Sequence, residues 1–221
     1  MIRLVADSSC DVYTLPGVDF RAVPLHISTD DGRAFIDDPE LNVGEMVDCL
    51  HSHKGRSYTA CPSVAAWLEA FEGADTVYVV TITSGLSGSY NSAKVAADLY
   101  QQASPEASVH VFDSLSTGPE ELLLLEKLRE LVNAGLEFEE VIRQAEDYMR
   151  HTRLFFSLHS LHNLAQNGRI GKVTAAAVSV MNIRVIGTAS PEGTLATIGK
   201  ARGDKRAEAV ILEQMQEAGY Q

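Results

Sequence analysis

The sequence predicts an α/β protein, in which an N-terminal domain with a mainly parallel sheet and helices on both faces is followed by a second α/β domain. Residues 76–80 (TVYVV) are β-branched or aromatic, which is typical of a buried parallel strand. Strand-like and helix-like segments alternate repeatedly up to Arg150, and the pattern changes after it. We therefore predict domains at residues 1–150 and 151–221.

The bulk composition is that of a globular protein. Of 221 residues, 45% are hydrophobic, which is enough for one large core or two smaller ones. The formal net charge of -12 argues against nucleic acid or an anionic membrane as the main partner, because both would repel the chain at long range. The three cysteines, Cys10, Cys49 and Cys61, have no paired spacing and indicate neither a disulfide framework nor a zinc ribbon.

The chain begins with a predicted strand that ends in small polar residues. The apolar run of residues 2–6 stops at Asp7, Ser8 and Ser9, and ligands of open α/β sheets bind at this end of the strands. We expect Asp7 to fix a turn by accepting backbone amides; the alternative is that Ser8 or Ser9 contacts a ligand directly. No charged leader precedes the strand and no apolar run approaches the ~20 residues of a membrane helix, so we expect a cytoplasmic protein without stable membrane insertion.

A second strand and a helix are expected next. Residues 20–27 (FRAVPLHI) are predicted to form one strand, with Pro24 at an edge or bulge. Residues 42–51 have the spacing of an amphipathic helix. The histidines that follow, His51 and His53, have no third ligand nearby in the sequence, so a metal site is not expected there.

Residues 81–93 (TITSGLSGSYNSA) join the buried strand to an alanine-rich helix through a glycine-serine turn. Gly85 and Gly88 let the backbone turn tightly and approach a ligand. Ser87 is expected to be the N-cap, which leaves the next amides, those of Gly88, Ser89 and Tyr90, without helical partners. These amides, the helix dipole and the hydroxyls of Thr83, Ser84, Ser87 and Ser89 predict a site for an anion. The alternative is that Ser87 is only a helix cap.

A second helix start is predicted at residues 59–63 (TACPS). Apolar residues recur at helical spacing after this segment, and Pro62 suits the first helical position. Thr59 would then lie at a second helix entrance with exposed donors, which suits binding of one carboxylate or phosphate. The alternative is that Thr59 only ends a loop.

The remaining elements complete both domains. We expect a strand at residues 108–112 and helices at residues 120–133 and 138–150. The C-terminal domain is predicted to contain a strand at 153–158, a short helix at 158–164, a small-residue helix at 173–180, a hairpin of 184–188 with 194–199, and a helix at 207–218. A basic cluster precedes the last helix and is either a solvated helix start or a patch for an anionic ligand or partner: Lys200, Arg202, Lys205 and Arg206.

Taken together, these motifs resemble the DegV family of bacterial fatty-acid-binding proteins. The most specific motif is SGLSG followed by Ser-Tyr, at residues 84–90. Several further motifs follow the same order as in the family: Asp7-Ser8-Ser9, Val23-Pro24-Leu25, TACPS, Asp113-Ser114, Gly168-Arg169-Ile170 and Lys200-Ala201-Arg202. The resemblance covers nearly the whole chain.

The resemblance implies that two α/β domains enclose a tunnel for a long-chain fatty acid. The carboxylate would be held by Thr59 and by either Ser84 or Ser87. It also implies a noncatalytic carrier without a cofactor or metal, which presents the acid to a separate ATP-dependent fatty acid kinase in phospholipid synthesis. Arg202 is implied in docking or phosphate contact, and Arg169 in structure or binding. The expected ligand-binding residues are Thr59, Ser63, Ser84, Gly85, Ser87, Gly88, Arg169 and Arg202.

The sequence also departs from the family pattern. The family's TSQPS is TACPS here, and its usual Lys-Pro is Arg184-Val185. The chain stops at Gln221, where relatives usually continue with another strand, a helix and a His-Gly segment, so we expect a C-terminal domain that is short relative to the family. Several small and apolar residues are expected to line the tunnel or to form ordinary core: Ala65, Leu68, Phe155, Phe156, Val178 and Met181.

Two kinds of enzyme and a structural module are the alternatives. A serine-dependent lipid or ester hydrolase would need Gly-x-Ser-x-Gly, and residues 85–89 (GLSGS) break that pattern at the last position. His110 and Asp113 are the candidate histidine and acid. The same turn would also suit an enzyme with a phosphate ligand, but the sequence lacks the Gly-Lys-Ser/Thr ending of a P-loop. A structural module would have a filled core and no tunnel.

Overall fold

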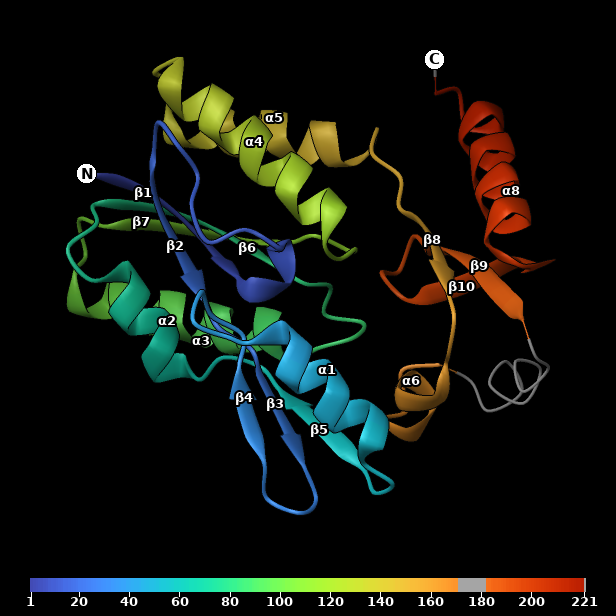
Figure 1. Cartoon of the computed structure of the whole chain (residues 1–221). Coiled ribbons are helices and arrows are strands. Elements are labelled where there is room, and N and C mark those ends of the chain that lie inside the picture. Colours follow the sequence, from blue (N-terminus) through green and yellow to red (C-terminus); the bar gives the residue numbers. More distant parts are fainter. Residues whose placement is uncertain (171–181, 221) are drawn as a thin grey trace. The chain divides into compact units, whose positions relative to one another are not determined.

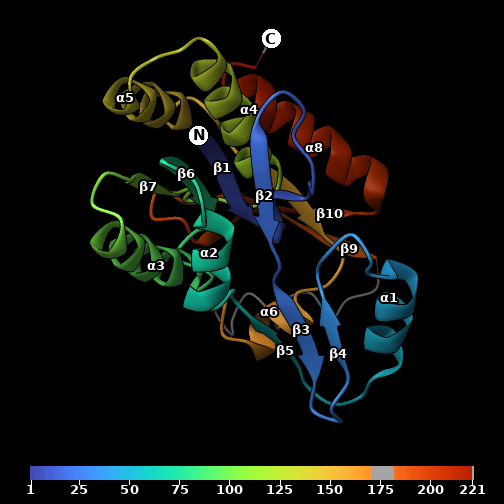
Figure 2. The same ribbon diagram turned by 90° about the vertical axis from the view of Figure 1, so that its left-hand side faces the viewer.

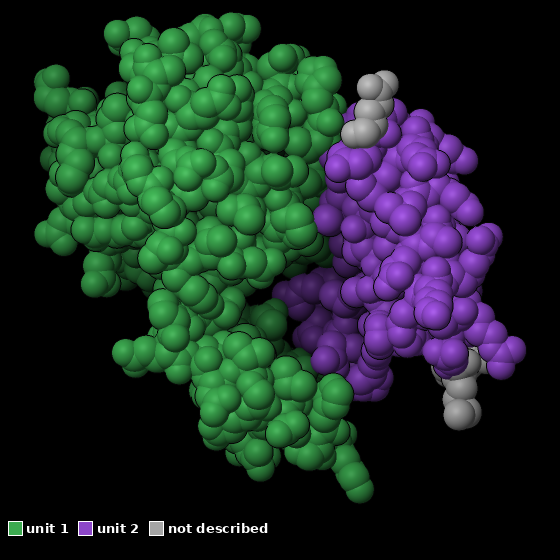
Figure 3. Space-filling view, turned by 45° about the horizontal axis from the view of Figure 1, so that its top comes forward, with its two compact units in different colours: residues 1–152 green, residues 153–221 purple. Residues whose placement is uncertain are grey.

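The computed structural model describes residues 1–170 and 182–220. The chain divides into two compact units, Met1–Thr152 and Arg153–Gln221, which are coloured green and purple in Figure 3. The helix expected at residues 173–180 and two of the expected lining residues, Val178 and Met181, lie outside the described residues.

A four-stranded parallel sheet forms the centre of the first unit. Its strands are paired in the order β2-β1-β6-β7, and every pair is parallel. Helices cover both faces, so the strands are apolar on both sides rather than alternating. This confirms the predicted α/β class. The strands are β1 (Ile2–Asp7), β2 (Asp19–Val23), β6 (Thr76–Thr81) and β7 (Ser108–Asp113).

The two faces of this sheet carry separate hydrophobic clusters, each beneath the pair of helices that covers that face in Figure 1. On one face, Val5, Val77 and Val79 pack with Trp67 and with the alanines of a neighbouring helix. On the other face, alternate strand residues pack against leucines. The first face is covered by α2 (Val64–Phe71) and α3 (Ser89–Ala103), the second by α4 (Pro119–Asn133) and α5 (Phe138–Met149).

A separate three-stranded antiparallel sheet also belongs to the first unit (Figure 2). The single strand expected at residues 20–27 is wrong, because the chain leaves the parallel sheet after Val23 and enters this second sheet at His26. Pro24 lacks an amide proton, and the Leu25 amide donates to Ser8 Oγ (3.0 Å) instead of a strand. The elements here are β3 (His26–Thr29), β4 (Ala34–Ile36), β5 (Ser57–Ala60) and α1 (Val43–Ser52).

The second unit is built on an antiparallel sheet with the order β10-β9-β8. The predicted hairpin is confirmed as β9 and β10, and a helix packs on it through Ile186, Ala201 and Ala207. The short helix is shorter than expected, because Leu158 pairs with Val185 as part of a strand. The elements are β8 (Phe155–Leu158), α6 (His162–Gln166), β9 (Ile183–Ala189), β10 (Leu195–Arg202) and α8 (Asp204–Glu217).

Candidate functional site

The candidate site of the first unit lies where three parallel strands end. Asp7 ends β1, Thr81 ends β6 and Asp113 ends β7, and these strands are neighbours in the sheet. The loop between β6 and α3, residues 82–88, starts at this edge. Ligands of open α/β sheets bind at such edges, so the sequence-predicted turn has the placement that it needs.

Backbone hydrogen bonds fix the β6–α3 loop. The Ser84 amide donates to Asp113 Oδ1 (3.0 Å), and the Gly85 amide donates to Thr83 Oγ1 (3.1 Å). The Ser87 amide donates to the Thr83 carbonyl (3.2 Å). These amides are satisfied within the protein, so contact with a ligand falls to the side chains of the loop and to the start of α3.

The start of α3 is one residue later than predicted. The helix begins at Ser89, and Gly88 rather than Ser87 is the N-cap. The Ser87 hydroxyl oxygen accepts the Ser89 amide (3.2 Å), as serine hydroxyls do with amides two residues on. One of the three amides that were expected to be free is therefore bound. The Gly88 amide donates no hydrogen bond within the described residues.

Three hydroxyl groups of the predicted site keep their protons available. The hydroxyls of Thr59, Ser84 and Ser87 donate to no group in the part of the chain that the structure describes. Thr59 and Ser84 are exposed and Ser87 is half-buried, so water or a ligand reaches them. Hydroxyl protons are good donors to a carboxylate.

The helix entrance expected at TACPS is wrong in its details. Thr59 lies in β5, opposite Ile27 of β3, and not at a helix start. Ser63 is the N-cap of α2, where its Oγ accepts the Ala66 amide (3.2 Å), and Pro62 precedes the cap. Pairing with a distant strand draws Thr59 into a sheet, and local sequence patterns do not show such pairing.

The two predicted motifs meet at the start of α3. The Ser92 hydroxyl donates to the Pro62 carbonyl (2.8 Å), which holds the TACPS segment against this helix. A Cβ atom added to Gly88 would lie 3.3 Å from Cys61 Sγ. A larger residue at position 88 would therefore press on Cys61, so the glycine permits this close approach.

The two predicted arginines belong to the second unit. Arg169 follows α6, and its amide donates to the Leu164 carbonyl (2.8 Å). Arg202 is exposed at the end of β10, opposite Ile183. Their roles in docking or binding stay predictions.

An apolar pocket of about 260 Å³ lies within the second unit. Phe156, one of the residues expected to line a tunnel, contributes to it. Apart from Thr197, the lining residues have apolar side chains, which suit a hydrocarbon chain, while polar atoms also contribute to the lining surface. The pocket is formed by Phe156, Leu158, Leu161, Ile170, Val185, Leu195, Ala196 and Thr197.

The histidine and acid considered for a hydrolase are engaged elsewhere. The His110 ring packs edge-on against Phe112, with ring centroids 4.4 Å apart, and burial lowers the pKa of the imidazole. Asp113 Oδ1 accepts the amides of Ser84 and Leu115. Within the described residues, no hydrogen bond joins Ser87 to a histidine.

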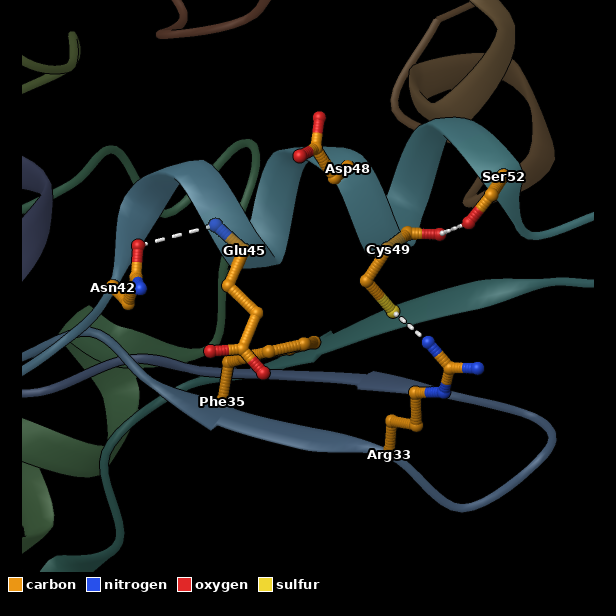
Figure 4. A pocket seen from close by; sticks show the side chains of 7 residues that line it. All are labelled: Arg33, Phe35, Asn42, Glu45, Asp48, Cys49 and Ser52. Atoms are coloured by element: carbon orange, nitrogen blue, oxygen red, sulfur yellow. Dashed lines mark hydrogen bonds between the residues drawn. The ribbon is translucent and has the colours of Figure 1, made fainter.

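A larger pocket, of about 590 Å³, lies along α1 and β4 and was not predicted. Figure 4 shows the Arg33 guanidinium pointing at Cys49, and Nη1 lies 3.2 Å from Sγ. Opposite charges line the same pocket, with Glu45 and Asp48 on the helix and Arg33 on the strand side. The arrangement defines no ligand.

Three potential metal ligands also lie close together, two in the turn after β3 and one at the end of α1. One ligand atom from each of Asp30, Asp31 and His53 lies within 4.8 Å of the others. Their atoms already have partners: Asp30 Oδ1 lies 2.7 Å from His53 Nε2, and Asp30 Oδ2 accepts the Arg56 amide (2.9 Å). These hydrogen bonds describe a turn that is closed by its own side chains, although both aspartates are exposed.

The described helices, in residues 1–170 and 182–220, include none that is both long and apolar enough to cross a membrane.

The fold and the candidate site place this chain in a class of two-unit α/β proteins. The first unit has a parallel sheet with a glycine-serine loop at the strand ends, and the second unit is built on an antiparallel sheet. The sequence narrows this class further. The chain belongs to the DegV family, since the family model described as "Uncharacterised protein, DegV family" matches residues 1–221. The predicted family is confirmed.

Relatives agree in sequence and in structure. A DegV domain-containing protein of Streptococcus pneumoniae is 41% identical over 222 residues, covering 99% of this chain and 79% of the relative. A DegV family protein from Eubacterium eligens, loaded with heptadecanoic acid, has a TM-score of 0.96 and 53% identity over 99% of this chain and 79% of that one. The fatty acid kinase (Fak) B3 protein of Streptococcus pneumoniae, loaded with linoleic acid, has a TM-score of 0.95 and 41% identity with the same coverage.

Proposed function

We propose that this protein is a noncatalytic carrier that binds one long-chain fatty acid and presents its carboxylate to a separate ATP-dependent fatty acid kinase. The observation that carries the proposal is the similarity to a protein loaded with heptadecanoic acid, over 99% of the chain at a TM-score of 0.96. The kinase partner is supported by the similarity to the fatty acid kinase B3 protein.

The head group is bound by donors of the first unit. The hydroxyls of Thr59, Ser84 and Ser87 and the Gly88 amide supply hydrogen bonds to a carboxylate, and the positive end of the α3 dipole adds to them. The Gly85 amide donates to Thr83 Oγ1 and so helps to hold the loop beside Ser84. Ser63 contributes through the helix α2 that it caps, because its hydroxyl oxygen is occupied by the Ala66 amide.

The tail supplies most of the favourable free energy. A chain of ~15 methylenes gains ~0.8 kcal/mol for each one buried, or about 12 kcal/mol in all. Association costs roughly 4 to 15 kcal/mol in lost freedom, so the head group must not oppose binding. The apolar pocket around Phe156 offers surface of the required kind, and the tunnel that the resemblance implies stays a prediction.

The arginines of the second unit are assigned to the later step. Arg202 is exposed, and we assign it to docking of the kinase or to contact with the phosphate that the kinase transfers. Arg169 is assigned either to binding or to the structure of its turn. A substitution of Arg202 is expected to reduce phosphorylation by the kinase more than it reduces fatty-acid affinity.

Single substitutions of the hydroxyl residues test the head-group site. Thr59→Val, Ser84→Ala and Ser87→Ala are each measured by calorimetric titration with palmitic acid. Loss of one charge-assisted hydrogen bond is expected to weaken binding about tenfold, and the larger loss identifies the contacting serine. Ser104→Ala is the matched control, since Ser104 follows the other end of α3 and is exposed. Unchanged affinity in all three variants would contradict the assigned site.

A further inference from the structure

Two carboxyl groups are buried together beside the candidate site. Asp7 ends β1, Glu121 lies in the first turn of α4, and both have no exposed surface. Among the described residues, no lysine, arginine or histidine forms an ion pair with either group. Two unpaired negative charges in one buried place would be strongly unfavourable, so the proton count of this pair needs an explanation.

The hydrogen-bond inventory of Ser9 requires an additional proton. Ser9 Oγ lies within hydrogen-bond distance of Asp7 Oδ1 and also of Glu121 Oε1 (2.7 Å). A hydroxyl carries one proton, so it donates to only one of two ionised carboxylates. Glu121 Oε1 also accepts the Gly118 amide (3.1 Å), while the buried Oε2 has no partner within the described residues. With one additional proton on the carboxyl pair, one carboxyl donates to Ser9 Oγ, and the Ser9 hydroxyl donates to the other.

The proton belongs on Glu121. Asp7 Oδ2 accepts the Ile82 amide (3.1 Å) and the Ser89 hydroxyl, and such bonds stabilise the charged form. Burial raises the pKa of both carboxyls, and it raises that of Glu121 well above its ordinary value, with the charge of Asp7 as the second cause.

The other titratable groups that face this pair are also acidic. Cys10 follows in the same turn, and burial raises the pKa of its thiol to about 12, so it remains neutral. Asp11 Oδ2 faces Gly118, and burial followed by the charge of Asp37 raises the pKa of this carboxyl. Neither of these titratable groups favours the loss of the shared proton. The Ser9 hydroxyl and the Gly118 amide do favour the charged form of Glu121, but burial outweighs them.

We propose that Asp7 and Glu121 share one proton, and that the Asp7 carboxylate of this pair is the positioning residue for the head-group loop. This rests on the proposed function. Asp7 binds Ile82 at the start of the loop and Ser89 at its end, and the loop between them carries Ser84, Ser87 and Gly88. When Glu121 loses its proton, a second buried charge repels Asp7, and the loop loses its fixed geometry.

The shared proton is measured directly on the ligand-free protein. Carbon-13 NMR of the carboxyl carbons is recorded across pH, with assignments from Asp7→Asn and Glu121→Gln. At neutral pH, the Glu121 carbon is expected at the position of a neutral acid and the Asp7 carbon at that of a carboxylate. If both carbons have the chemical shifts of ionised carboxylates at neutral pH, the proposal is overturned.

The positioning role is measured by palmitic acid affinity as a function of pH. Wild-type affinity is expected to fall as pH rises through the Glu121 pKa, and Glu121→Gln is expected to remove this fall. Asp7→Asn is expected to weaken binding about tenfold at every pH. Glu130→Gln, an exposed acid of the same helix, is expected to keep the wild-type profile.

The outcomes separate the two proposals. If the palmitic acid affinity of Glu121→Gln falls with rising pH as steeply as that of the wild type, the positioning role is overturned. Ser9→Ala, which removes the bridging hydroxyl, takes the place of Asp7→Asn if circular dichroism shows that the latter does not fold. If the wild type binds no palmitic acid at any pH, the proposed function fails, while the carbon shifts still decide the shared proton.

Discussion

Arg3 stabilises the first unit by linking β1 to the end of α2. Its guanidinium is 3% exposed and donates to the carbonyls of Ala70 (2.9 Å) and Glu72 (2.8 Å), while Nε pairs with Asp19 (2.8 Å). These bonds use the planar fork of arginine, which lysine lacks.

Replacement of Arg3 by methionine leaves buried acceptors unpaired. Arg3→Met is expected to lower the free energy of unfolding by about 3 kcal/mol, measured by urea denaturation. Arg21→Met is the matched control on the neighbouring strand, because Arg21 is exposed and makes one bond to the Glu69 carbonyl (3.0 Å); it is expected to cost less than about 0.5 kcal/mol. Equal costs would show that burial of Arg3 is not the cause.

Glu121 makes the stability of the protein depend on pH. The folded pKa of its carboxyl lies well above the ordinary value of 4.5, mainly through burial, so folding takes up a proton at pH values between the unfolded and the folded pKa. The stability contributed by the protonated form is fully present below the unfolded pKa and is lost as pH rises toward the folded pKa.

Glu121→Gln should therefore remove part of this pH dependence. The free energy of unfolding of the variant, relative to wild type, is expected to increase by ~1.4 kcal/mol for each pH unit between the unfolded and folded pKa values. Urea denaturation at several pH values measures the difference. A difference that is constant with pH would mean that Glu121 is ionised in the folded protein.

The sequence did not reveal the partners of key residues that are far apart along the chain. Asp7 was expected to fix a turn by accepting backbone amides, and instead it accepts the amide of Ile82, 75 residues away. The partnership of Asp7 with Glu121 was not predicted, because it joins residues that are far apart in the sequence. The same reason applies to His53, whose partner Asp30 is 23 residues away along the chain.

At the level of elements, the hairpin of the second unit depends on one glycine. Gly187 of β9 lies opposite Phe156, and a Cβ atom added there would lie 2.3 Å from Phe156 Cζ and 2.7 Å from the Ala196 carbonyl oxygen. The ring therefore covers the glycine, and the backbone of β10 closes the other side.

A methyl group at this position has no room. Gly187→Ala is expected to lower the free energy of unfolding by about 2 kcal/mol and to reduce hydrogen-exchange protection in β9. Gly199→Ala is the matched control in the same sheet, since its nearest neighbour would be Val210 Cγ1 at 4.0 Å. If both variants are equally stable, the Phe156 contact does not constrain the sheet.

Most elements were predicted correctly because their patterns are local. The parallel strands, α3 and α4 follow from apolar runs and helical spacing. The strand expected at residues 20–27 failed where the chain changes sheets at Pro24, and the helix entrance expected at Thr59 failed where β5 pairs with β3. Pairing between distant strands decided both cases, and periodicity does not encode it.

For the whole molecule, the alternation of strands and helices was sufficient to predict the α/β class. The antiparallel sheet of the small strands was not, because its strands are short and joined by a turn and a helix. The family resemblance contributed what periodicity could not, namely a ligand class for the glycine-serine loop. The comparisons support that class through relatives that carry bound fatty acids.

The most direct test of the central claim is the mass of the undenatured protein. Native mass spectrometry of the full chain, purified without added lipid and then incubated with palmitic acid, measures whether one acid is bound per chain. We predict a mass increase equal to that of a single fatty acid. The fraction of chains with this added mass is expected to be smaller for the double variant Thr59→Val/Ser87→Ala. A folded wild-type chain that remains at its bare mass before and after incubation would contradict the account.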